Sequence, residues 1–345
     1  MSDAQKEIKF PIREAREIVK DLMPPNAFIY WADFLFHIAL GWIFFFFCFN
    51  SELFSLNQWS FFFVSTFAFF RAAIFIHELT HLRKGTFVLF RITWNLLCGF
   101  PLMIPSFLYQ GVHNDHHNMN LYGTKDDGEY FPFIHEGKLK IILFVLVSFL
   151  VPVFFFIRFV FLAPLSYCHK SVRYFVLEKT SSLSIDLNYK RTPASLNAVP
   201  MWQFQETVTC LYGWTFLLLI TQGVLPYVVL GLWFITLGVV FFVNSLRTLA
   251  AHRYRYPGNE ILDISEQLLD SVNIPESLFG ILWAPVGLRF HATHHLIPEM
   301  PYHSLGETHR RLMQKFSKKS LYIQTTSRSL SSTLKHLWRE AGNLS

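Results

Sequence analysis

The stretch WSFFFVSTFAFFRAAIFIHELTHLRK, residues 59–84, decides the fold of this chain. Its apolar part, about 58–76, matches the roughly 20 residues that a helix needs to cross the hydrocarbon core of a bilayer. Because no glycine or proline interrupts the stretch, the predicted helix continues past the membrane edge. His77 and His81 then project just beyond the membrane surface, on one face of that helix.

Three further apolar runs, at 28–49, 207–222 and 225–243, are predicted to cross the membrane, so that the four spans form two hairpins. The linkers inside both hairpins lack Lys and Arg, whereas the outer flanks of both hairpins carry these residues. Positively charged flanks stay in the cytoplasm. We therefore expect the N-terminus, the C-terminus and the active site on the cytoplasmic side of a bacterial inner membrane or of the endoplasmic reticulum.

Two other apolar stretches, 87–110 and 139–164, do not fit simple crossings. Both contain proline, and the second contains Pro152 and also Arg158. A single crossing at 139–164 would invert the second hairpin, and the stretch is too short for two crossings of roughly 20 residues each. We interpret both stretches as interfacial or re-entrant helices, which leaves four spans in total.

The composition agrees with a membrane protein. Of the 345 residues, 52% are hydrophobic and 16% are charged, against roughly 25% charged residues in a soluble domain. The net charge of +6 is typical of a cytoplasmic membrane face rather than a nucleic-acid site. Around a membrane domain at 28–305 we expect an amphipathic N-terminal segment, 1–27, and a basic cytoplasmic tail, 306–345. The apolar face of the N-terminal segment is expected to carry Ile12, Ala15, Val19 and Leu22.

Nine of the fifteen histidines stand in groups with helical spacing or directly after a hairpin. Positions i, i+3 and i+4 of a helix lie on one face, so that one helix can aim two or three imidazoles at a common point. One group has the spacing HxxxH, two have the spacing HxxHH, and one histidine stands alone. The nine candidate ligands are His77, His81, His113, His116, His117, His252, His291, His294 and His295.

The lone histidine, His252, is placed by the fourth span. If that helix runs on to Tyr256, the residue before Pro257, His252 lies about 13 Å beyond Val243 at 1.5 Å per residue. All four groups then converge on the cytoplasmic side. Nine imidazoles are too many for one ion and suit two transition-metal ions, although imidazole alone does not choose among iron, copper, zinc and nickel.

The segment from His77 to His81 also reads HExxH, the zinc metalloprotease motif in which the glutamate acts as general base. A membrane-embedded zinc protease is therefore an alternative. It leaves seven clustered histidines unexplained, and it usually places its metal within the bilayer, whereas His77 is expected at or past the membrane edge. A metal transporter would need polar residues deep in the spans, where the sequence has few.

The set HxxxH, HxxHH and HxxHH after paired spans resembles the membrane-bound fatty acid desaturases and their hydroxylase relatives. The stretch RFHATHHLIPEMPYH, residues 289–303, looks especially like bacterial acyl desaturases, and 244–254 is similar to the segment that supplies their lone ninth histidine. The resemblance covers about 28–315. It implies an all-α membrane protein in which a four-span stalk supports a cytoplasmic helical cap. In that cap the nine histidines would hold a non-haem di-iron site that activates O2. Where the acyl-CoA branch has an asparagine four residues before the lone histidine, this chain has Thr248, so we do not carry that role over.

Metal-bound imidazoles are usually oriented by a polar partner on their second ring nitrogen. Six side chains are candidates for that role: Asp115, Asp270, Glu299, Glu307, His303 and His309. No catalytic residue beyond the metal ligands, and no substrate-binding residue, is assigned from the sequence.

The resemblance implies an O2-dependent fatty acyl desaturase that acts on acyl-CoA, an acyl carrier or a phospholipid. A hydroxylase of a fatty acid, sphingolipid or carotenoid on the same scaffold is the alternative. The chain has no HPGG-type haem segment and no cysteine set for an iron–sulfur cluster. Electrons are therefore expected from a separate protein such as ferredoxin, rubredoxin or cytochrome b5. The basic tail suits an acidic electron donor or anionic lipid headgroups.

Overall fold

The computed structural model describes residues 10–83, 85–191, 199–258, 260–277, 279–316 and 320–343. Helices dominate this part of the chain, with three isolated β-bridges and no longer strand among the described residues. The chain folds as two compact units, and each is described by itself. The long-helix unit comprises Ala27–Asn114 and Phe144–Val243, and the short-helix unit comprises Met1–Asn26, Asp115–Leu143 and Asn244–Ser345.

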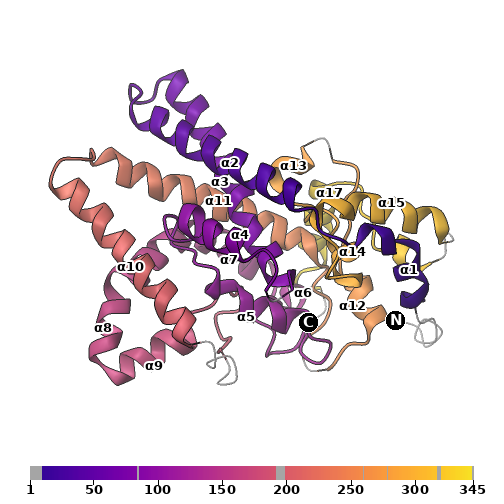
Figure 1. Ribbon diagram of the computed structural model, residues 1–345. Coiled ribbons are helices and arrows are strands. Elements are labelled where there is room, and N and C mark those ends of the chain that lie inside the picture. Colours follow the sequence, from indigo (N-terminus) through magenta and orange to yellow (C-terminus); the bar gives the residue numbers. More distant parts are fainter. Residues whose placement is uncertain are drawn as a thin grey trace. The chain divides into compact units, whose positions relative to one another are not determined.

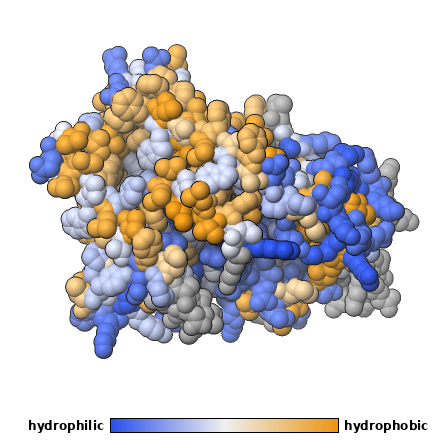
Figure 2. All heavy atoms as spheres, viewed as in Figure 1, coloured by the Kyte–Doolittle hydropathy of each residue, from blue (hydrophilic) through white to orange (hydrophobic). Residues whose placement is uncertain are grey.

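In the long-helix unit, α2 (Ala27–Phe49) and α3 (Leu56–His81) pack side by side along their length (Figure 1). α3 begins at Ser55, whose side chain accepts a hydrogen bond from the Gln58 backbone N–H. Gly41 allows the close approach, because a Cβ atom there would lie 2.6 Å from the Phe69 ring. Apolar side chains gather on the outer surface of these helices (Figure 2), as lipid-facing surfaces require.

The other elements of this unit are helices of different lengths. Two of them are π-helical turns, η3 and η4, which each continue a preceding α-helix. In chain order they are α4 (Val88–Trp94), η3 (Asn95–Gly99), α5 (Phe107–His116), α7 (Lys138–Ile157), η4 (Arg158–Leu162), α8 (Ala163–Cys168), α9 (Lys170–Lys179), α10 (Val199–Thr221) and α11 (Val228–Ala251).

Within the part of the chain that the structure describes, four helical stretches are long and apolar enough to cross a membrane: Ala27–Phe49, Leu56–His81, Lys138–Cys168 and Val228–Ala251. Three of them contain the spans predicted at 28–49, 58–76 and 225–243. The predicted span 207–222 lies within α10, which does not belong to these four. The apolar helix Val88–Gly99 is too short to cross, which agrees with the interpretation of 87–110 as no simple crossing.

The interpretation of 139–164 as an interfacial or re-entrant stretch is not supported, because Lys138–Cys168 is one helical stretch of 31 residues. Pro152 lies inside α7 without ending it, as prolines can in membrane helices whose neighbours satisfy the freed backbone groups. Arg158 is buried and pairs with the carboxylate of Glu206 on α10. A charge neutralised in this way does not exclude the stretch from a membrane.

The short-helix unit contains ten helical elements among its described residues, and none is longer than α15 and α17. Its surface over α1 and α15 is mainly hydrophilic (Figure 2). The elements are α1 (Ile12–Ile18), η2 (Lys20–Leu22), α6 (Phe133–Glu136), α12 (Ile264–Asp270), α13 (Gly280–Trp283), α14 (His291–Leu296), η6 (Tyr302–Ser304), α15 (Leu305–Lys315), α16 (Leu321–Gln324) and α17 (Leu330–Glu340).

Both predicted terminal segments contribute to the core of this unit. Of the four residues predicted on the apolar face, Ala15 and Val19 are fully buried, whereas Ile12 and Leu22 are partly buried. In the predicted tail, Leu312 and Tyr322 are fully buried too. The described part of 306–345 is therefore a folded portion of the unit rather than a solvated extension.

The prediction that the fourth span continues to Tyr256 is wrong, since α11 ends at Ala251. The chain leaves the helix because its backbone pairs with the end of α12. The Val272 N–H donates to the Ala251 carbonyl, and the Arg253 N–H donates to the Asp270 carbonyl. His252 thus sits in an isolated β-bridge with Ser271, not on a helical turn.

Candidate metal centre

Three of the candidate ligands, His291, His294 and His295, lie on the short helix α14 of the short-helix unit. Thr293, between them, anchors this helix. Its backbone N–H and its hydroxyl both donate to Oδ1 of Asn273, at 3.0 and 3.1 Å. A single fully buried amide side chain therefore fixes the helix that presents three imidazoles.

Four imidazoles converge in the short-helix unit, one each from His116, His252, His291 and His295, with ligand atoms all within 4.8 Å of one another. Nε2 of His252 lies 3.2 Å from Nε2 of His116 and 2.8 Å from Nε2 of His291. Nε2 of His295 lies 3.1 Å from Nε2 of His291. We call this group the histidine quartet. Its members come from α5, from the residue after α11, and from α14.

His116 shows which ring nitrogen is available for a metal ion. Its Nδ1 lies 2.9 and 3.1 Å from the two carboxylate oxygens of Asp127. An ionised carboxylate only accepts hydrogen bonds, so Nδ1 carries the proton and donates it to Asp127. The lone pair of the neutral ring is then on Nε2, which faces the other members of the quartet.

His252 is oriented in the same sense through Tyr122. The Tyr122 hydroxyl donates to Oδ2 of Asp270 at 3.1 Å, and its oxygen lies 2.8 Å from Nδ1 of His252. With the hydroxyl proton directed at Asp270, the phenol oxygen accepts from Nδ1–H of His252. Nε2 of His252 therefore also turns its lone pair toward the quartet. Lone pairs that face one another at about 3 Å repel unless a cation lies among them, so the donor set fits a transition-metal ion.

The pKa directions of these side chains agree with this assignment. Burial, together with neighbouring imidazoles, lowers the pKa of His252 and of His291 well below the ordinary value, which keeps both rings neutral. For His116, burial also opposes protonation, but the charge and hydrogen bond of Asp127 outweigh it and raise the pKa. A more basic ring is a better metal ligand.

The other five candidate ligands also lie in groups. In the long-helix unit, His81 Nε2 lies 2.8 Å from His113 Nε2, and the His77 ring is 4.5 Å from the His113 ring. In the short-helix unit, His117 Nε2 lies 3.0 Å from His294 Nε2. All nine predicted histidines thus lie beside other predicted histidines within their own units.

The predicted orienting residues divide into two kinds. Asp270 reaches His252 through Tyr122, as described above. Glu299 instead pairs with Arg16 at 2.6 Å, and His303 accepts the Asn26 backbone N–H at 3.1 Å. These two side chains therefore bind the N-terminal segment through these contacts. Three further positions can be placed: Asp115 is half-buried, Glu307 pairs with Arg310 and Arg311, and Nδ1 of His309 lies 2.9 Å from the Tyr322 hydroxyl.

Two orienting residues, Asp127 and Tyr122, were not predicted. Asp127 is fully buried and also accepts the Gly123 backbone N–H at 2.9 Å. It belongs to a turn, and the spacing of the histidines does not predict that this turn brings Asp127 back to His116. An aspartate that bonds nearby backbone N–H groups in a glycine-containing turn is the only signal that sequence could have offered.

A cavity of about 190 Å³ adjoins this centre within the short-helix unit. His117 and His295 form part of its wall, together with Leu268 from α12 and with Ile12 and Arg16 from α1. The N-terminal helix thus lines the same cavity as two of the candidate ligands.

Comparison with known proteins agrees with the geometry. Residues 53–327 match the family model described as fatty acid desaturase. The chain is 37% identical over 328 residues to a ceramide hydroxylase of Caulobacter vibrioides, which covers 95% of this chain and 93% of that protein. No solved structure matches. The chain belongs to the fatty acid desaturase family of membrane oxidoreductases.

Proposed function

We propose that this protein is an O2-dependent di-iron enzyme that hydroxylates the aliphatic chain of a ceramide-type sphingolipid. The observation that carries the proposal is the histidine quartet, whose four Nε2 atoms converge while Asp127 and Tyr122 hold Nδ1 of His116 and of His252. The ceramide hydroxylase, similar over nearly the whole chain, supports the lipid class. Family membership leaves no ground for the zinc protease interpretation.

The ligands of two iron ions are proposed to be the nine histidines predicted from the sequence, and the quartet is proposed to hold one of these ions. Bound iron would supply the activation of O2 that removes hydrogen from an unactivated alkyl chain. The chain's own residues hold and orient the imidazoles. Asp127 keeps a proton on Nδ1 of His116, and Tyr122 with Asp270 keeps one on Nδ1 of His252.

The overall reaction requires electrons from outside the chain. Hydroxylation converts R–H, O2, two electrons and two protons into R–OH and water. Desaturation uses the same inputs, removes two hydrogens from the chain and releases two waters. A separate electron carrier, for which ferredoxin, rubredoxin and cytochrome b5 are the candidates, is proposed as the source. Desaturation is the second candidate function, and the family match to residues 53–327 favours it.

Expression of the protein in a sphingolipid-containing host under ¹⁸O2 is expected to yield a ceramide that carries one additional labelled oxygen atom. Mass spectrometry of the lipid extract, with an empty-vector host as control, measures this product. A ceramide or acyl chain that lacks two hydrogens and carries no label would establish desaturation instead. A lipid profile identical to that of the control host would contradict both candidate functions.

The candidate active site is proposed to face the cytoplasm, as the Lys and Arg residues on the outer flanks of the α2–α3 hairpin indicate. Arg339 lies exposed on α17 of the short-helix unit, so a cysteine in its place reports on the location of that unit. Arg339→Cys in sealed, right-side-out membranes is expected to resist a membrane-impermeant thiol reagent until the membranes are opened. The reaction of Cys168, which is exposed in the wild-type protein, is subtracted by means of a Cys168→Ser background. Equal labelling before and after opening would contradict the assignment.

A further inference from the structure

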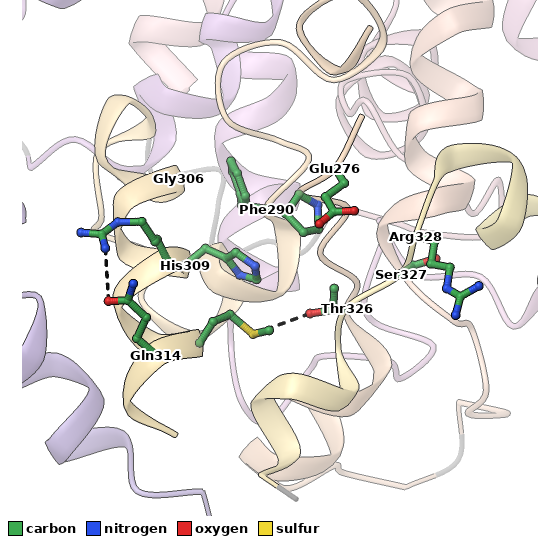
Figure 3. A pocket seen from close by; sticks show the side chains of 11 residues that line it. Glu276, Phe290, Gly306, His309, Gln314, Thr326, Ser327 and Arg328 are labelled. Carbon is green, nitrogen blue, oxygen red and sulfur yellow. Dashed lines mark hydrogen bonds between the residues drawn. The ribbon is translucent and has the colours of Figure 1, made fainter. Parts of the chain in front are cut away.

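The short-helix unit has a second, larger pocket, of about 590 Å³ (Figure 3). One wall is α15, with His309, Arg310 and Met313. The remainder comes from Phe290, which precedes α14, and from the segment Thr326 to Arg328. In Figure 3 the His309 side chain lies in the middle of the pocket. No function described so far uses this pocket.

The pocket adjoins the start of α14, the helix that carries three candidate ligands. Phe290 lines it and is followed in the chain by His291. A second connection runs through hydrogen bonds, since Nδ1 of His309 lies 2.9 Å from the Tyr322 hydroxyl, which lies 2.6 Å from the Thr293 hydroxyl. Both Tyr322 and Thr293 are fully buried. One aromatic ring and one buried hydrogen-bonded chain therefore link the pocket wall to α14.

Basic side chains outnumber acidic ones around the pocket, although one of them, Arg310, is ion-paired with Glu307. Arg328 is exposed, and no carboxylate lies within ion-pair distance of it among the described residues. The Arg289 guanidinium lies over the Phe290 ring, 4.8 Å from its centre. In the sequence, 306–345 contains eight Lys and Arg against two Glu, so this segment alone accounts for the whole net charge of +6. Glu276 is the one acidic residue in the pocket wall.

We propose that this pocket is the docking site of a soluble, acidic electron-carrier protein. The inference rests on the proposed function, because that reaction consumes two electrons that the chain cannot supply itself. Complementary charge steers and orients such a partner. Basic side chains would also attract an anionic lipid surface. A flat lipid surface, however, does not fill a concave pocket whose wall continues into α14. We therefore assign the pocket to a protein.

Binding of an acidic [2Fe–2S] ferredoxin to the full chain in nanodiscs tests the proposal. Surface plasmon resonance with Arg310→Glu combined with Arg328→Glu is expected to show affinity lowered by about tenfold or more, chiefly through slower association. The matched control, Lys335→Glu with Arg339→Glu, makes the same change in charge on exposed positions of α17 outside the pocket wall. It is expected to bind ferredoxin within about threefold of wild type, since neither of these side chains lines the pocket.

Equal affinity of the pocket variant and the α17 variant for ferredoxin would overturn the proposal. So would binding of the wild-type protein, but not of the pocket variant, to phosphatidylglycerol vesicles when both bind ferredoxin equally, since the basic surface would then belong to the membrane. Lipid oxidation by protein that is first reduced chemically in the absence of O2, freed of excess reductant and then exposed to O2 separates this inference from the proposed function. Chemically driven oxidation without ferredoxin binding would reject the docking site alone, whereas no oxidation with any reductant would reject the function.

Discussion

The His252→Ala variant is expected to lose one iron per chain and essentially all lipid oxidation. His252 is the member of the quartet whose Nε2 contacts those of both His116 and His291. Without it, the remaining imidazoles no longer surround an ion. The loss of activity should exceed the roughly 10–100-fold typical of residues that only orient a ligand. Elemental analysis of purified protein and lipid mass spectrometry measure the two effects.

His336→Ala is the matched control, because this histidine lies exposed on α17 and pairs with Glu340. It should retain wild-type iron and activity. Gel filtration identifies any variant that fails to fold. A monodisperse His252→Ala protein with the full wild-type iron content would show that the quartet is not a metal site.

Asp127→Asn gives an intermediate case within the same prediction. The amide retains the shape of the carboxylate but removes the charge that raises the pKa of His116. Iron affinity is expected to fall by about 10–100-fold, so that activity returns when excess iron is supplied. His252→Ala should not recover under those conditions. A chelator titration of both variants distinguishes weakened binding from a lost ligand.

A large loss of stability is expected when Glu206 is replaced by Gln. This carboxylate is 1% exposed and pairs with two guanidinium groups, those of Arg158 and Arg173, in the long-helix unit. Its removal leaves a buried positive charge without compensation, a change that costs about 3–5 kcal/mol of unfolding free energy. Denaturant titration in detergent, followed by tryptophan fluorescence, measures it.

Glu178→Gln is the matched control, since Glu178 pairs with the exposed Lys190 at 3.6 Å. An exposed pair of this kind contributes about 0–1 kcal/mol, so the midpoint of unfolding should barely move. Equal shifts for Glu206→Gln and Glu178→Gln would mean that the buried pair adds nothing beyond a surface interaction.

The candidate ligands were predictable from the sequence because each group depends on local helix geometry. The three histidines of α14 lie within five residues of one another, and the fold only has to provide the helix. Asp127 was not predictable, since its approach to His116 depends on the turn between them. His252 was found for a wrong reason, because it occupies a β-bridge rather than a continued helix.

The membrane helices show the same division between local and distant causes. Length and apolar character identified α2, α3 and α11 without knowledge of their neighbours. A crossing at 139–164 was not predicted, because it would invert the predicted second hairpin and because the stretch contains Pro152 and the charged Arg158. Its partner, Glu206, lies 48 positions along the chain and becomes visible only in the folded protein. A charged residue in an apolar stretch is thus a poor argument against a membrane crossing when folding pairs it with an opposite charge.

The helix α1 lines the same cavity as His117 and His295. This placement bears on how firmly a metal ion bound by these imidazoles would be retained. This helix has only seven residues, and it closes part of the cavity beside two imidazoles. Although Ala15 of this helix is buried in the core, opening of one short helix costs less free energy than unfolding of the whole unit. Escape of an ion to a chelator would then follow the fraying of α1 rather than denaturation of the whole chain. Truncation or tagging ahead of Asn26 is therefore expected to speed the loss of bound metal from the purified protein.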